Sequence, residues 1–88
     1  MTDKIVVYAT SWCGDCRRAK KFLDDHGIAY DLVDIDQNAD GEAFVKQANR
    51  GNRSVPTIVF SDGSMLVEPR NSQLAEKLGI DLEAERGY

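Results

Sequence analysis

Hydrophobic and polar positions along the first half of the chain predict a strand, a helix and a second strand. Residues 5–9 form a short apolar run rich in β-branched side chains, which is typical of a strand buried on both faces. Residues 13–26 repeat apolar positions at helical spacing and are followed by Gly27, a common helix terminator. Residues 28–36 alternate loosely, as a strand does. A strand–helix–strand unit of this length predicts two parallel strands.

The second half of the chain predicts a helix, a hairpin and a final helix. Residues 38–41 supply turn and cap chemistry for a short helix that ends near Asn49. Residues 55–60 predict a strand whose proline is tolerated because it stands at the beginning. A Ser-Asp-Gly-Ser turn then leads into residues 65–67 as the antiparallel partner. The last helix follows a proline and ends at Gly79.

The order β-α-β-α-β-β-α predicts an α/β fold with a four-stranded mixed sheet and helices on both faces. A chain of 88 residues is too short for two independent cores. We expect one domain over residues 1–79 and a loosely ordered C-terminal tail over residues 80–88.

The net charge of −4 argues against a nucleic-acid-binding surface, since no long basic stripe is present. The apolar runs are far shorter than a membrane span, and the first ten residues lack the pattern of a signal segment. We therefore expect a soluble, cytoplasmic protein that binds neither nucleic acid nor membrane.

Both cysteines lie in the stretch TSWCGDCRR, as Cys13 and Cys16. A disulfide between them would close a loop too small to stabilise a fold. A zinc site takes about four ligands, and only His26 could join the two sulfurs, so we predict no metal site. In a reducing compartment such a pair more often carries redox chemistry.

The predicted helix gives the two thiols different positions. Cys13 stands at the helix start, where unpaired backbone N–H groups and the macrodipole favour a thiolate. Cys16 lies one turn further in. Arg17, four residues after Cys13, can approach the thiolate, whereas Asp15 points away from it because residues two apart lie on different faces. Asp15 is then mainly a helix-start anion that also edges the entrance for the substrate.

Three other features each have a functional and a simpler interpretation. Trp12 could belong to the core, but because it directly precedes a reactive cysteine we expect it to form part of a substrate platform. Residues 36–41 resemble half of a calcium loop, yet Gln47 replaces the bidentate glutamate, so they are better explained as loop and cap residues. His26 is most simply a favourable charge at a helix C-terminus.

Through TSWCGDC, GNRSVPT and FSDGS the sequence resembles the glutaredoxin family, and more narrowly the mycoredoxins, over about residues 4–78. The resemblance implies the thioredoxin fold in its minimal form and a thiol–disulfide oxidoreductase. It implies that Cys13 is the nucleophile and Cys16 the resolving thiol, and that the two form a redox-active disulfide. It also implies a cis-proline loop at Val55 and Pro56. The substrate-binding residues expected from motif and resemblance together are Trp12, Gly14, Asp15, Arg17, Ser54, Val55 and Pro56.

Mycoredoxins reduce mixed disulfides between proteins and the small thiol mycothiol, so the resemblance implies that co-substrate and no tightly bound cofactor. The Gly-Gly and Asp motif with which glutaredoxins grip glutathione is replaced here by LVEPRNS over residues 66–72, which argues against glutathione. The expected partners are proteins carrying mixed disulfides and a recycling reductase, and the expected state is a monomer. Two alternatives stay open, a dithiol electron donor to a reductase and a dimer that binds an iron–sulfur cluster through Cys13.

Overall fold

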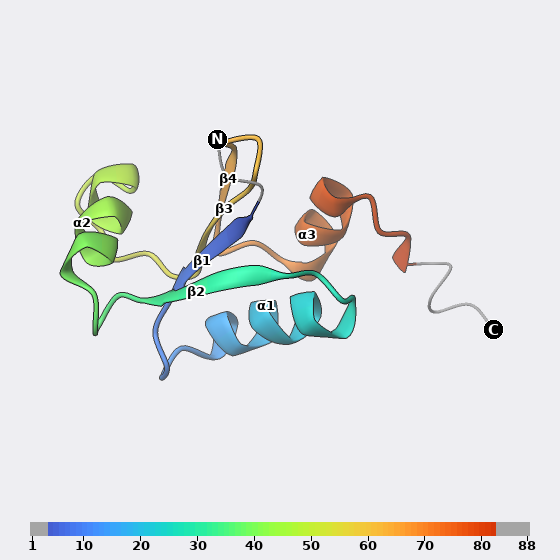
Figure 1. The fold of residues 1–88 in the computed structure, drawn as a ribbon, viewed down its shortest axis with the longest axis horizontal. Coiled ribbons are helices and arrows are strands. Elements are labelled where there is room, and N and C mark those ends of the chain that lie inside the picture. Colours follow the sequence, from blue (N-terminus) through green and yellow to red (C-terminus); the bar gives the residue numbers. More distant parts are fainter. Residues whose placement is uncertain (1–3, 83–88) are drawn as a thin grey trace.

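The computed structural model describes residues 4–82 and contains the predicted elements in the predicted order (Figure 1). In chain order they are β1 (Ile5–Ala9), α1 (Gly14–Asp25), β2 (Tyr30–Asp34), α2 (Ala39–Ala48), β3 (Thr57–Val59), β4 (Met65–Val67) and α3 (Asn71–Leu78). None of the helices in this part of the chain is long and apolar enough to cross a membrane.

The four strands form one mixed sheet in the order β2-β1-β3-β4. β1 is parallel to β2, as the strand–helix–strand pattern predicted, and antiparallel to β3. Val7 lies opposite Leu32 on one side and Ile58 on the other. β3 and β4 form the predicted hairpin, with Ile58 opposite Leu66. β1 is an inner strand of the sheet. The cysteine-containing stretch directly follows β1 and therefore lies at one end of the sheet.

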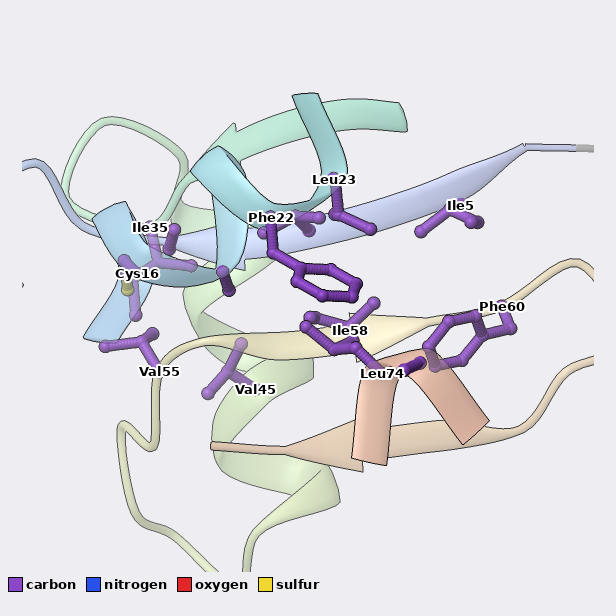
Figure 2. Close-up of a cluster of buried hydrophobic side chains, with 14 residues drawn as sticks. Ile5, Cys16, Phe22, Leu23, Ile35, Val45, Val55, Ile58, Phe60 and Leu74 are labelled. Carbon is purple, nitrogen blue, oxygen red and sulfur yellow. The ribbon is translucent and has the colours of Figure 1, made fainter. Parts of the chain in front are cut away.

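The main core lies between the sheet and the helices α1 and α3. Figure 2 shows Phe22 and Leu23 of α1, Ile58 of β3 and Leu74 of α3 gathered in one cluster. Leu23, Ile58 and Leu74 are completely buried. This packing fixes α1, and therefore the cysteines at its start, against the sheet.

The expectation that β1 is buried on both faces is wrong. Ile5, Val7 and Ala9 are buried, whereas Val6 and Tyr8 on the opposite face are only half-buried. The Tyr8 ring stacks on Phe44 of α2 with the ring centroids 4.8 Å apart. Since α2 covers only part of this face, the strand keeps one half-open side.

β2 and β3 are shorter than the sequence pattern predicted, whereas β1 and β4 have the predicted bounds. β2 begins at Tyr30 because the backbone N–H of Ile28 still closes the end of α1, donating to the Leu23 carbonyl at 2.9 Å. β3 begins at Thr57, so Val55 and Pro56 lie in the preceding loop.

The last helix ends as predicted, at Gly79 with a φ of 72°. The first residues of the expected tail pack on the protein, because Ile80 donates to the Ala75 carbonyl at 2.8 Å and Ile80 and Leu82 are partly buried against the core. Residues 83–88, the rest of that predicted tail, lie outside the described residues. The domain boundary after residue 79 stays a prediction.

Candidate active site

Cys13 is the N-cap residue of α1. Its backbone is extended, with φ −89° and ψ 120°, and its carbonyl accepts the first helical bond, from Arg17 at 3.1 Å. The Cys13 side chain makes no cap hydrogen bond, so the free N–H groups of the first turn lie beside the sulfur. These groups and the helix dipole favour a negative charge at this point. The half-buried thiol therefore lies beside the helix N-terminus, where a substrate can reach it.

Cys16 lies beneath Cys13 and is completely buried. Burial raises the pKa of Cys16 to about 11, the neighbouring Cys13 adds to this effect, and a hydrogen bond from the Thr10 backbone opposes it. Figure 2 shows the Cys16 sulfur at the end of the core, near Ile35 and Val55. At neutral pH this second thiol is protonated and shielded from solvent.

The loop before β3 faces Cys13 from the other side of the site. The Val55–Pro56 peptide bond is cis, and the Cys13 Sγ lies 3.8 Å from the Val55 carbonyl oxygen. The Thr57 hydroxyl donates to the Ser54 carbonyl at 2.7 Å, and the backbone N–H of Glu68 donates to the Pro56 carbonyl at 2.8 Å. These bonds fix the loop to β3 and β4, so the carbonyl that faces the sulfur is held in place.

The charged residues of α1 near the cysteines are engaged by other groups. Arg17 Nη1 donates to the Ser11 carbonyl at 3.3 Å, which joins the helix to the stretch before it. The Asp15 carboxylate pairs with Arg18 Nη2 at 3.4 Å. Asp15 therefore has an arginine partner of its own, the half-buried Arg18, as suits an anion in the first helical turn.

Trp12 is 63% exposed and is therefore no part of the core. Its indole Nε1 donates to Asp36 Oδ2 at 2.8 Å. Arg53 Nη2 donates to the other Asp36 oxygen at 2.5 Å, and Arg53 Nε donates to Glu42 at 2.6 Å. The Arg53 guanidinium, and then the Trp12 indole, hold the pKa of Asp36 below its usual range.

The sequence interpretation missed Asp36, Glu42 and Arg53. The sequence pattern indicated only that Asp36 belongs to a set of loop and cap residues, and it gave no partner for the carboxylate. The available signal was Trp12 itself, because an indole N–H beside a reactive cysteine needs a hydrogen-bond acceptor.

The structure brings most of the predicted site residues together around Cys13. Cys16 lies behind the sulfur, Val55 with Ser54 and Pro56 faces it, and Trp12 stands beside it. Gly14 is the first residue of α1, and no atom lies within 4 Å of the place where a Cβ would stand. Asp15 and Arg17 lie on the same first turns but pair with other groups.

Within residues 4–82 no three His, Cys, Asp or Glu side chains come together as a metal-binding group.

Comparison with known proteins agrees with this geometry. The glutaredoxin family model matches residues 5–65. A chain of Mycobacterium tuberculosis provisionally named as a glutaredoxin is 46% identical, covering 89% of this chain and 93% of its own length. Mycoredoxin 1 of Corynebacterium glutamicum is 42% identical over 86% of this chain and 94% of its own.

Solved structures show the same fold. A point mutant of the thioredoxin-like protein BC3987 has a TM-score of 0.79 and 29% identity. The match covers 91% of this chain and 100% of the BC3987 chain. Methanoredoxin of Methanosarcina acetivorans has a TM-score of 0.70 and 32% identity, with 88% and 85% of the two chains covered. With a thiol at a helix start facing a cis-proline loop, this chain belongs to the glutaredoxin family and is a thiol–disulfide oxidoreductase.

Proposed function

We propose that this chain reduces mixed disulfides between proteins and a low-molecular-weight thiol, with mycothiol as that thiol and Cys13 as the nucleophile. The observation that carries the proposal is the placement of Cys13. Its half-buried sulfur lies at the start of α1 and 3.8 Å from the Val55 carbonyl, with Cys16 buried behind it. One sulfur is accessible to a substrate and the other can reach only the first.

In the first step the Cys13 thiolate attacks the small-thiol sulfur of the mixed disulfide. A disulfide forms between Cys13 and the small thiol while the original one breaks. The protein sulfur leaves as a thiolate and takes a proton from solvent. An extended client segment can lie along the cis-proline loop, next to the Val55 backbone.

The resulting adduct can be resolved in two ways. A second small thiol can attack the small-thiol sulfur, which yields the small-molecule disulfide and frees Cys13. Alternatively, Cys16 attacks the Cys13 sulfur, releases the small thiol and leaves a Cys13–Cys16 disulfide. A recycling reductase must then supply two electrons and two protons to restore both thiols. We place this cycle in the cytoplasm, where thiols are kept reduced, and expect a monomer to carry it out.

Mycothiol is favoured by the 42% identity to a protein named mycoredoxin 1 and by residues 66–72, which lack the glutathione-gripping motif. The test offers the pure protein one client carrying mycothiol, glutathione or bacillithiol. We expect the fastest turnover with mycothiol. Equal, slow rates with all three would contradict the choice of thiol.

The roles of the cysteines are tested with the same substrates. Cys13→Ser should abolish turnover because the attacking sulfur is gone, whereas Cys16→Ser should leave it largely intact while free mycothiol is supplied. Turnover by Cys13→Ser would contradict the assignment.

A dithiol donor is the second candidate, favoured by the burial of Cys16 directly against Cys13. A glutaredoxin-like protein named NrdH from Lactococcus lactis is also 34% identical over 66% of this chain. Loss of all activity in Cys16→Ser, with a reductase as the electron source, would favour this candidate.

A further inference from the structure

A chain of hydrogen bonds connects the two segments that flank Cys13. Trp12 Nε1 donates to Asp36 Oδ2 at 2.8 Å, and Arg53 Nη2 donates to Asp36 Oδ1 at 2.5 Å. Arg53 Nε also donates to Glu42 Oε2 at 2.6 Å. Each Asp36 oxygen thus binds one of the two segments.

The ends of this chain stand next to the reacting sulfur. Trp12 directly precedes Cys13, and Arg53 stands two residues before Val55, whose carbonyl lies 3.8 Å from the Cys13 Sγ. Asp36 itself is fixed just beyond β2, where its backbone N–H donates to Asp34 Oδ1 at 2.9 Å. The Asp36 backbone is therefore fixed next to the sheet, while its side chain binds both segments.

Packing alone cannot orient the Trp12 ring, because 63% of the residue is exposed. An exposed indole changes rotamer freely unless a directional bond holds it. A hydrogen bond from an N–H group to an ionised carboxylate is stronger than one between two neutral groups. A substrate bound at Cys13 would therefore meet a surface whose shape depends on the bonds made by Asp36.

We propose that Asp36 is a positioning residue that holds Trp12 and the cis-proline loop in one arrangement around Cys13. A mixed disulfide then docks on a preformed surface, and Asp36 takes no part in the covalent step. The inference rests on the proposed function, since it concerns how that substrate is bound.

The first test separates binding from chemistry. Asp36→Ala removes both acceptor oxygens, so we expect KM for the mixed disulfide to rise about tenfold, because displaced binding groups cost affinity. The kcat and the rate at which iodoacetamide alkylates Cys13 should stay within about twofold of wild type. Asp36→Asn keeps one acceptor oxygen and should give an intermediate KM. An unchanged KM in Asp36→Ala would overturn the proposal.

The second test observes the ring directly, because Trp12 is the single tryptophan of the chain. Its fluorescence should be quenched more readily by acrylamide in Asp36→Ala. Combining Asp36→Ala with Trp12→Phe, which lacks the N–H, should raise KM by less than the product of the two single effects. Effects on KM that simply multiply would overturn the link between Asp36 and Trp12.

A matched control and a second variant keep the tests decisive. Asp31→Asn removes one carboxylate from β2, where Asp31 pairs with Lys4 at 3.8 Å, and should leave KM unchanged. If Asp36→Ala fails to fold, Arg53→Gln breaks the bonds from the cis-proline loop to Asp36 and Glu42, leaves the Trp12–Asp36 bond in place, and should still raise KM. Absence of turnover in the wild-type protein would contradict the proposed function itself. Normal wild-type turnover together with an unaltered KM in the variants would contradict only the positioning role of Asp36.

Discussion

At the scale of single residues, two chemically identical side chains receive different properties from their surroundings. Cys13 is half-buried at a helix start, and Cys16 is completely buried one turn later, with its pKa raised to about 11. A nucleophile must reach its substrate, while a resolving thiol needs to reach only the adduct. The difference in burial thus suits a first reaction in which Cys13 attacks the substrate and a second in which Cys16 resolves the adduct.

This difference predicts a loss of stability at alkaline pH. A thiol whose pKa rises from 9.0 to about 11 on folding favours the folded state below pH 9 and loses that contribution as the pH increases toward 11. Between pH 8 and pH 10.5 the loss should amount to roughly 2 kcal/mol. Urea unfolding at pH 8 and pH 10.5 measures it, and Cys16→Ala should lose less stability over this interval. An equal alkaline loss in the variant would show that Cys16 is not responsible.

At the scale of elements, α2 approaches β2 more closely than a side chain at its first turn would allow. A Cβ on Gly41 would stand 2.7 Å from a methyl carbon of Val33. The Asn38 side chain caps the same turn by accepting from the Gly41 N–H at 2.8 Å. Both features set where α2 begins, and with it the position of Glu42.

Gly41→Ala should therefore destabilise the protein by about 1–2 kcal/mol, because the clash outweighs the better helix propensity of alanine. Gly14→Ala is the matched comparison, since no atom stands within 4 Å of the new Cβ. That substitution should leave the free energy of unfolding unchanged or slightly increased. Thermal unfolding of the two variants provides the measurement, and equal melting temperatures would contradict the argument.

At the scale of the whole molecule, Arg18 joins the first helix to the segment that begins the last. Its Nη1 donates to Asn71 Oδ1 at 3.0 Å, and its Nη2 donates to the Pro69 carbonyl at 3.2 Å. These contacts link residues more than fifty positions apart and close one side of the core between α1 and α3.

Arg18→Met should lower the free energy of unfolding by about 1–2 kcal/mol, since it leaves a carbonyl and an amide oxygen without their donor. Lys21→Met removes an equal charge from the same helix, where Lys21 pairs only locally with Asp25 at 2.9 Å and is highly exposed. Its cost should be much smaller, because an exposed surface ion pair contributes little to stability. Denaturant titration distinguishes the two, and equal costs would mean that the long-range contact adds nothing.

Local patterns were enough to predict the element order, the hairpin and the helix end at Gly79, because each depends on residues close together in sequence. The half-open face of β1 was missed because it depends on how much of the sheet α2 covers. The hydrogen bonds of Asp36 were missed for a similar reason, since Trp12 and Arg53 lie far from Asp36 in the sequence and contact it only in the folded protein. The cis bond before Pro56 was expected only from the family resemblance, as an X-Pro bond is usually trans.

The strand order places β2 and β4 at the two edges of the sheet, where unpaired backbone could recruit another chain. β4 offers only three residues, and Glu68, with a φ of 50°, and Pro69 end it abruptly. β2 carries the carboxylates of Asp31 and Asp34, whose charges would repel a second copy paired alongside. Although Leu32 of β2 and Met65 and Val67 of β4 are exposed, these edges make a poor template for intermolecular strand pairing, so the protein should resist aggregation at high concentration.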